Sequence, residues 1–131
     1  MINVKFVTPD GLYKEVESKT VSCLTTDGWR CILENHMPTV LMLEISRFET
    51  VESGKKQMYA ISGGMVYFED NNATVLVSQI EHQNEIDIER AKASKDRAEK
   101  RIAKNKENLD LKRAQIALAK AINRIDVASY K

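Results

Sequence analysis

The stretch ATVLVSQIEHQNEIDIERAKASKDRAEKR, residues 73–101, contains the point at which the chain changes character. Its first part, Ala73–Glu81, is apolar and rich in β-branched residues, which is typical of a strand. From Asn84 onward, apolar residues recur at helical spacing among many charges. We therefore expect a β domain over residues 1–84 and a helical segment over residues 85–131.

Short strand-like runs also fill the sequence before this stretch. They are separated by turn residues at Pro9-Asp10-Gly11, Asp27-Gly28, Pro38, Gly54 and Asn71-Asn72. Several short strands at near-regular spacing predict an all-β sandwich or barrel. The clearest hairpin joins MVYFED to ATVLVS across Asn71 and Asn72.

Two glycines and four methionines inside these runs carry separate expectations. Gly63 and Gly64 are followed by MVYF, a strand sequence and not a helix, so they indicate a bulge or a close backbone approach. The methionines are expected to fill gaps in the core. They are Met37, Met42, Met58 and Met65.

The helical segment reads as two helices joined by a turn. Asn84 with Asp87 forms a loose capping box at its start, and KNKEN at 104–108 is polar and turn-like. Two helices with a short connection pack antiparallel. The predicted contact stripe is Ile88, Ala91, Ala98 and Ile102 on the first helix, interrupted by Lys95, and Leu111, Ala114, Leu118, Ile122 and Ile125 on the second.

The apolar seam of this α-helical hairpin is narrow and its surface is basic. Residues 1–85 carry 7 Lys and Arg against 12 Asp and Glu, whereas residues 86–131 carry 13 against 7, within a total charge of +1. Ala91 and Ala98 facing Ala114 and Ala121 let the two helix axes approach. These alanines bury little area, so the hairpin is expected to be barely stable alone. A marginal element of this kind is a candidate switch, and its charge favours an acidic partner or a polyanion, although a solvated helix surface explains the same charge.

Several site classes have no support in the sequence. Cys23 and Cys31 have no second Cys or His pair at metal spacing and are expected to be free thiols. No apolar run reaches the roughly 18 residues of a membrane helix. The first residues show no signal-peptide core, which predicts a cytosolic protein.

Three stretches in order and at the right spacing resemble the epsilon subunit of F-type ATP synthases. They are ILENHMP at 32–38, AISGGMVYFEDNNATVLVSQIE at 60–81 and EIDIERAKASKDRAEKRI at 85–102. The first is similar to the histidine- and proline-containing turn of the family. The second is similar to its Gly-Gly strand with the following valine-rich strand, and the third to the start of its helical hairpin.

The resemblance implies an all-β sandwich of about ten strands followed by a C-terminal antiparallel α-helical hairpin. It implies a non-catalytic subunit of the complex whose sandwich binds the gamma subunit and the c-ring. It also implies a hairpin that alternates between a compact form and an arm that reaches the alpha/beta hexamer and inhibits ATP hydrolysis. The implied location is peripheral, at the cytoplasmic face of the bacterial cell membrane, with membrane contact only through the complex.

The resemblance also implies a regulatory ATP site that requires no metal. IDIERA matches the family's nucleotide motif through Ile86, Asp87, Arg90 and Ala91. On helices, Arg97 lies seven residues after Arg90, and Lys120 and Arg124 lie four apart, so the four cations can clamp a triphosphate. Glu81 resembles a further contact of the family. No GxxxxGK[ST] loop occurs, so bound ATP is expected to be a ligand and not a substrate.

Two features weaken this site. Lys120 stands where ATP-binding members have arginine, which keeps the charge but loses the bidentate fork. Without the family resemblance, Arg90, Arg97 and Arg124 read as solvated helix charges and Asp87 as a cap.

Contacts to the c-ring or the gamma subunit are predicted at Trp29, His36 and Met37. His36 alone is a weak signal for a metal or for catalysis, and a turn histidine bonded locally explains it too. Trp29 follows Gly28 and is expected to be an exposed binding anchor. Trp29, Cys31 and Glu34 are departures from the family pattern, so this region can bind its ring differently.

A different class of function remains as an alternative. A β domain with a basic tail can be a nucleic-acid-binding module. Only 6% of the residues are aromatic, and basic residues in the β part are few. We therefore predict no nucleic-acid partner. An enzyme would need a nucleophile, a histidine and a carboxylate placed together, and the sequence shows no such cluster.

Overall fold

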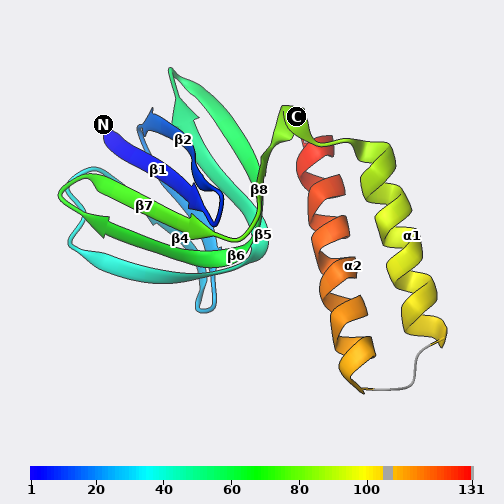
Figure 1. Cartoon of the computed structure of the whole chain (residues 1–131). Coiled ribbons are helices and arrows are strands. Elements are labelled where there is room, and N and C mark those ends of the chain that lie inside the picture. The colour runs from blue at the N-terminus through cyan, green and yellow to red at the C-terminus, as the bar shows by residue number, and fades with distance from the viewer. Residues whose placement is uncertain (105–107, 131) are drawn as a thin grey trace. The chain divides into compact units, whose positions relative to one another are not determined.

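The computed structural model describes residues 1–104 and 108–130, together with all side chains outside 105–110 and 131. The chain divides into two compact units, Met1–His82 and Gln83–Lys131 (Figure 1). The first unit contains β1 Ile2–Thr8, β2 Gly11–Ser18, β3 Val21–Thr25, β4 Gly28–Ile32, β5 Thr39–Glu52, β6 Lys55–Glu69, β7 Asn72–Val77 and β8 Ile80–His82. The second contains the short 3-10 helix η1 Gln83–Glu85, α1 Ile88–Lys104 and α2 Asn108–Ser129.

The strands form a two-layer sandwich because β5 and β6 are long enough to run through both layers. One layer contains β2, β1, β7, the end of β6 and the start of β5. The other contains β8, the start of β6, the end of β5, β3 and β4. The predicted sandwich with a C-terminal hairpin is confirmed. The ten strands of the family resemblance are eight continuous strands in the described residues, since β5 and β6 each contribute to both layers.

Local irregularities bend the two long strands where they change layer. Beside β3, the pairing jumps from Cys23–Phe48 to Thr25–Leu43, so β5 contains extra residues and bends there. On β6, Gly63 and Gly64 have φ of +92° and +146°. A Cβ on Gly64 would lie 2.0 Å from the carbonyl oxygen of Leu76. The predicted close backbone approach at this glycine pair is confirmed.

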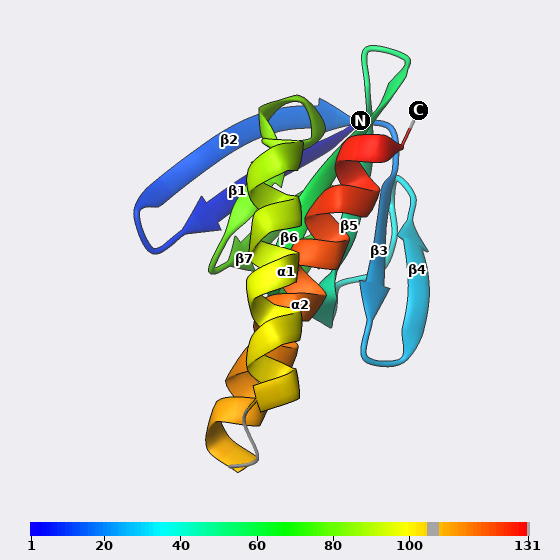
Figure 2. The same cartoon turned by 90° about the vertical axis from the view of Figure 1, so that its right-hand side faces the viewer.

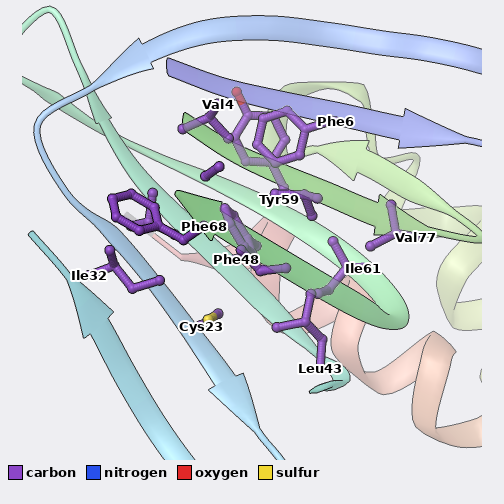
Figure 3. Close-up of a cluster of buried hydrophobic side chains, with 14 of the residues drawn as sticks. Val4, Phe6, Cys23, Ile32, Leu43, Phe48, Tyr59, Ile61, Phe68 and Val77 are labelled. Carbon is purple, nitrogen blue, oxygen red and sulfur yellow. The ribbon is translucent and has the colours of Figure 1, made fainter. Parts of the chain in front are cut away.

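Alternating apolar residues of both layers form the core of the sandwich. On β1, Ile2, Val4 and Phe6 are fully buried, as a half-buried strand predicts. The Phe6 ring lies 4.7 Å from that of Tyr59 and 5.4 Å from that of Phe48, centroid to centroid (Figure 3). These rings join β1 to β5 and β6 across the core.

The hairpin between β6 and β7 is confirmed, with its turn one residue earlier than predicted. Glu69 pairs with Asn72, so Asp70 and Asn71 are the two turn residues. Their φ values of 50° and 60° are left-handed, as the tight turns of two-residue hairpins require. Asp and Asn are the non-glycine residues that adopt this conformation most readily.

The two helices of the second unit lie side by side (Figures 1 and 2). The four seam alanines, Ala91 and Ala98 on α1 and Ala114 and Ala121 on α2, are all buried. Small side chains at the seam allow close backbone approach, as the sequence predicts. Ile88 and Ile122 are exposed instead of lying in the seam, and Val127 is buried.

The N-terminus of α1 begins later than the capping box predicts. The first intrahelical bond runs from the Ala91 amide to the Asp87 carbonyl, at 3.0 Å. Asp87 Oδ1 also accepts from the Arg90 amide at 3.2 Å, so Asp87 and not Asn84 is the N-cap. The Asn84 position falls in η1, which ends before α1 starts.

Candidate functional site

The predicted nucleotide residues are divided between the two units. Glu81 lies on β8 in the first unit, where it pairs with Ala60 of β6. The others lie in the second unit. They are Ile86, Asp87, Arg90, Ala91, Arg97, Lys120 and Arg124.

On α1, the motif residues separate into buried and exposed members. Ile86 and Ala91 are buried and therefore pack, whereas Asp87 and Arg90 are exposed and available to a ligand. Asp87 uses Oδ1 to cap the helix, and a carboxylate has further lone pairs for another donor. Asp87 is therefore a helix cap, which was the alternative reading from the sequence. Capping leaves its other lone pairs available to a ligand.

The cations lie on helices that run in opposite directions. Arg90 is at the start of α1 and Arg124 is near the end of α2, so both lie toward the same end of the hairpin. Arg97 lies two turns along α1, about 10 Å from Arg90. Its guanidinium donates to Ser94 Oγ at 3.0 Å. Lys120 and Arg124 are half-buried one turn apart on α2.

The predicted contact residues of the first unit lie at two ends of β4. Trp29 is at the start of this strand, whereas His36 and Met37 lie in the loop after its end. From Trp29 to its last residue, Ile32, the strand spans about 10 Å. The structure therefore gives two separate surface points and not one cluster.

Trp29 is exposed, as the sequence predicts, with 48% of its surface accessible. The Arg47 guanidinium lies 4.5 Å from the centre of its ring. Arg47 Nε is 3.7 Å and Lys56 Nζ 3.1 Å from Glu49 Oε1. A stacked cation restricts the indole, so Trp29 is a preordered apolar side chain on the surface.

The loop Leu33–Pro38 presents apolar side chains to solvent. Met37 is 72% exposed, and the His36 ring is held by its own loop because Nδ1 lies 2.7 Å from the Met37 carbonyl oxygen. The local bond fits the turn histidine expected as an alternative. The prediction that Met37 fills the core is wrong.

A row of apolar side chains on the outer face of one layer was missed in the sequence. It crosses five paired strands through Leu12, Val7, Leu76, Met65 and Met42, and we call it the outer apolar row. Met42 is 54% exposed, so its prediction as core is also wrong, whereas Met58 is buried as expected. The only sequence signal was TVLML, residues 39–43, in which both faces of the strand are apolar. Leu12, Leu76 and Met42 are exposed, whereas Val7 and Met65 are half-buried. An apolar row on the outer face is a candidate binding surface.

The described residues add neither a metal site nor a membrane-spanning helix. Among the side chains outside 105–110 and 131, no group of three His, Cys, Asp or Glu could hold a metal ion. Among the described helices, none is long and apolar enough to cross a membrane. Cys23 is buried and Cys31 exposed, and both are free thiols as predicted.

Two family models together match nearly the whole chain. Residues 1–83 match the beta-sandwich domain of the ATP synthase delta/epsilon chain, and residues 84–129 match its long alpha-helix domain. The chain is 41% identical over 128 residues to the ATP synthase epsilon chain of Bacillus cytotoxicus, covering 98% of this chain and 96% of that one. It is 39% identical over 127 residues to the ATP synthase epsilon chain of Bacillus licheniformis, covering 97% of each.

Solved structures show the same fold at lower identity. A chain of the mitochondrial ATP synthase of Euglena gracilis has a TM-score of 0.83 at 22% identity, covering 98% of this chain and 81% of that one. A chain from the central stalk and c-ring structure of the Tetrahymena thermophila mitochondrial ATP synthase has a TM-score of 0.62 at 13% identity, covering 98% of this chain and 96% of that one. These relatives are all ATP synthase chains, so they do not support the alternative of a nucleic-acid-binding module. With both of its units matched in order by one family, the chain belongs to the ATP synthase delta/epsilon chain family.

Proposed function

We propose that this chain is the non-catalytic epsilon subunit in the central stalk of a rotary F-type ATP synthase. The observation that carries the proposal is the match of both units, in order, to relatives that are themselves named epsilon chains. The sandwich is the part that binds the gamma subunit and the c-ring. The complex is at a membrane, and the proposed location of the subunit is the cytoplasmic face.

The two apolar surfaces of the sandwich supply separate docking points in this proposal. The outer apolar row is wide enough to cross one whole layer and suits a long partner such as gamma. The Leu33–Pro38 loop, with His36 and Met37, is the proposed contact to the c-ring. Trp29, at the other end of β4, is a further anchor on gamma or the ring.

The hairpin is proposed to regulate ATP hydrolysis. Its seam is made largely of alanines, so opening it exposes little apolar area and costs little free energy. In the open form its cations reach the alpha/beta hexamer and inhibit hydrolysis. In the closed form ATP is held by Arg90, Arg97, Lys120 and Arg124, with Asp87 on the adenine, and ATP favours the closed form because it binds that form better.

Calorimetric titration of the full chain with ATP tests the regulatory site. Arg90→Ala should weaken binding about tenfold or more, because a charge-assisted hydrogen bond contributes about 1.5–3 kcal/mol. Lys120→Arg should strengthen it, because the guanidinium can bind phosphate in bidentate form. Arg113→Ala, an exposed cation on α2 outside the proposed site, is the matched control and should change little.

The outcomes separate the two parts of the proposal. If millimolar ATP gives no heat and no protection of the hairpin from proteolysis, the ATP site is wrong while the subunit role stands. If Arg113→Ala weakens binding as much as Arg90→Ala, the attraction is unspecific. The subunit role itself is tested by adding the chain to ATP synthase depleted of its epsilon subunit, where it should restore coupling and lower ATP hydrolysis.

A further inference from the structure

Asn71 holds the Leu33–Pro38 loop from outside the loop. Its side-chain Oδ1 accepts a hydrogen bond from the Asn35 backbone amide at 2.6 Å. Its Nδ2 donates to the Asn35 side-chain Oδ1 at 3.0 Å. Two reciprocal bonds thus join residues that are 36 positions apart in the sequence.

The backbone at both ends of this bridge is in an unusual conformation. Asn35 and Asn71 have φ of 64° and 60°, both left-handed. Asn71 lies in the β6–β7 turn, and its carbonyl oxygen accepts from the Asn3 amide of β1 at 2.9 Å. The bridge is therefore anchored in the sheet, and it fixes the middle of the loop.

A second contact holds the next residue of the loop. The His36 ring meets the Phe68 ring edge to face, at 5.9 Å between centroids, and Phe68 is fully buried in the core. The loop is thus held at Asn35 by hydrogen bonds and at His36 by ring packing. Its two large apolar side chains nevertheless point to solvent, since Leu33 is 56% and Met37 72% exposed.

We propose that Asn71 is a positioning residue for the c-ring contact. It acts through Asn35, by holding Leu33 and Met37 in the conformation that binds the ring. A loop that is ordered before binding does not lose that conformational freedom in the complex, so affinity rises without any new contact. This inference rests on the proposed function, which assigns the loop to the ring.

The test compares variants of the full chain that keep the turn intact. Asn71→Gly removes both side-chain bonds, and glycine adopts the left-handed φ without strain. Asn71→Asp keeps a carboxylate oxygen that accepts from the Asn35 backbone amide. If the Asn35 side-chain carboxamide turns over, its Nδ2 can donate to the other carboxylate oxygen. Asn72→Ala is the matched control, because the Asn72 side chain donates only to the Asp70 carbonyl within the same turn, at 2.9 Å.

Binding is measured twice, to epsilon-depleted ATP synthase in membranes and to the same catalytic portion stripped of its ring. Asn71→Gly should weaken the first about three- to tenfold, as expected for ordering one or two side chains. It should leave the second unchanged. Asn71→Asp should restore most of the loss. Hydrogen exchange of the Asn35 amide should rise in Asn71→Gly and not in Asn72→Ala, which shows that the loop has been released in a folded protein.

Direct variants of the loop distinguish failure of the inference from failure of the proposed function. If Leu33→Ala and Met37→Ala weaken ring-dependent binding while Asn71→Gly matches Asn72→Ala, the positioning role is overturned and the ring contact stands. If neither loop variant changes ring-dependent binding, the proposed contact is wrong and the inference falls with it.

Discussion

Gly64 illustrates how one residue shapes the sandwich. It lies on β6 between its partners Leu43 of β5 and Val77 of β7, where β6 passes from one layer to the other. Its φ of +146° and the nearby Leu76 carbonyl leave no room for a side chain. A glycine pair inside a strand sequence was enough to predict this, because only glycine tolerates both conditions.

Gly64→Ala should therefore destabilise the sandwich by about 2 kcal/mol or more, since the new methyl group meets backbone that cannot move aside. Urea unfolding of the full chain, followed at the sandwich, measures the loss. Gly54→Ala is the control: Gly54 also has a left-handed φ, of +77°, but nothing lies within 4 Å of an added Cβ. Equal losses in both variants would contradict the role given to the Leu76 carbonyl.

Cys23 gives a residue-scale prediction about pH. Burial, with a smaller effect of Cys31, raises the pKa of the Cys23 thiol from 9.0 to about 11. The fold thus favours the neutral thiol, so the stabilisation is present below the unfolded pKa and is lost as pH rises through about 9 to about 11. Cys23→Ala should make the free energy of unfolding less dependent on pH in that interval.

A thiol reagent at pH 8 should label exposed Cys31 quickly and Cys23 only after unfolding, and rapid labelling of both would contradict the burial.

The methionines mark the limit of reasoning from single residues. Met58 is buried, but Met37 and Met42 are exposed. In TVLML every residue after Thr39 is apolar, so alternation could not say whether Leu41 and Leu43 or Val40 and Met42 face the core. The choice is made by Val66 and Phe68 on β6, which face the same interior as Leu41 and Leu43.

At the scale of elements, the hairpin is held by a seam of small residues. Ala91, Ala98, Ala114 and Ala121 are buried, as expected for alanines that face each other across the seam. The first residue of α1 was harder to predict, because Asn84 and Asp87 are both good N-caps. Asn84 lies in the short η1 helix instead, and capping preference alone does not predict which of the two residues caps α1.

A larger residue in the seam should open the hairpin. Ala98→Leu places three extra heavy atoms between helices that are in contact, and such overpacking costs about 1–3 kcal/mol. Hydrogen exchange in α1 and α2 should speed up. Ala93→Leu, at an exposed position of the same helix, should leave exchange nearly unchanged, because leucine is almost as good a helix former as alanine. Unchanged exchange in Ala98→Leu would mean that the seam is not where the helices touch.

At the scale of the whole molecule, the chain is two units with unlike means of stability. The unit Met1–His82 has a large core of branched and aromatic side chains, whereas the unit Gln83–Lys131 is held by alanines and a few aliphatic residues. Unequal stability is the property that lets one part move while the other stays fixed.

A chain ending after Asn84 should therefore keep a cooperatively folding sandwich. Its thermal unfolding should be a single transition, and it should still bind the gamma subunit, because the outer apolar row and the core are complete within residues 1–82. The full chain is the reference in both measurements. Loss of cooperative unfolding in the shortened chain would contradict the independence of the two units.

The sequence by itself determined what depends on neighbours along the chain. The change from strand to helix near Asn84, the β6–β7 turn, the glycine pair and the alanine spacing are all local patterns of backbone preference and periodicity. Only the tertiary structure decided that β5 and β6 cross both layers, that Met42 lies in an exposed row, and that Asn71 meets Asn35. These features depend on which distant strands pair and in what register. Local sequence patterns do not specify that pairing, which is decided when the core brings distant side chains together.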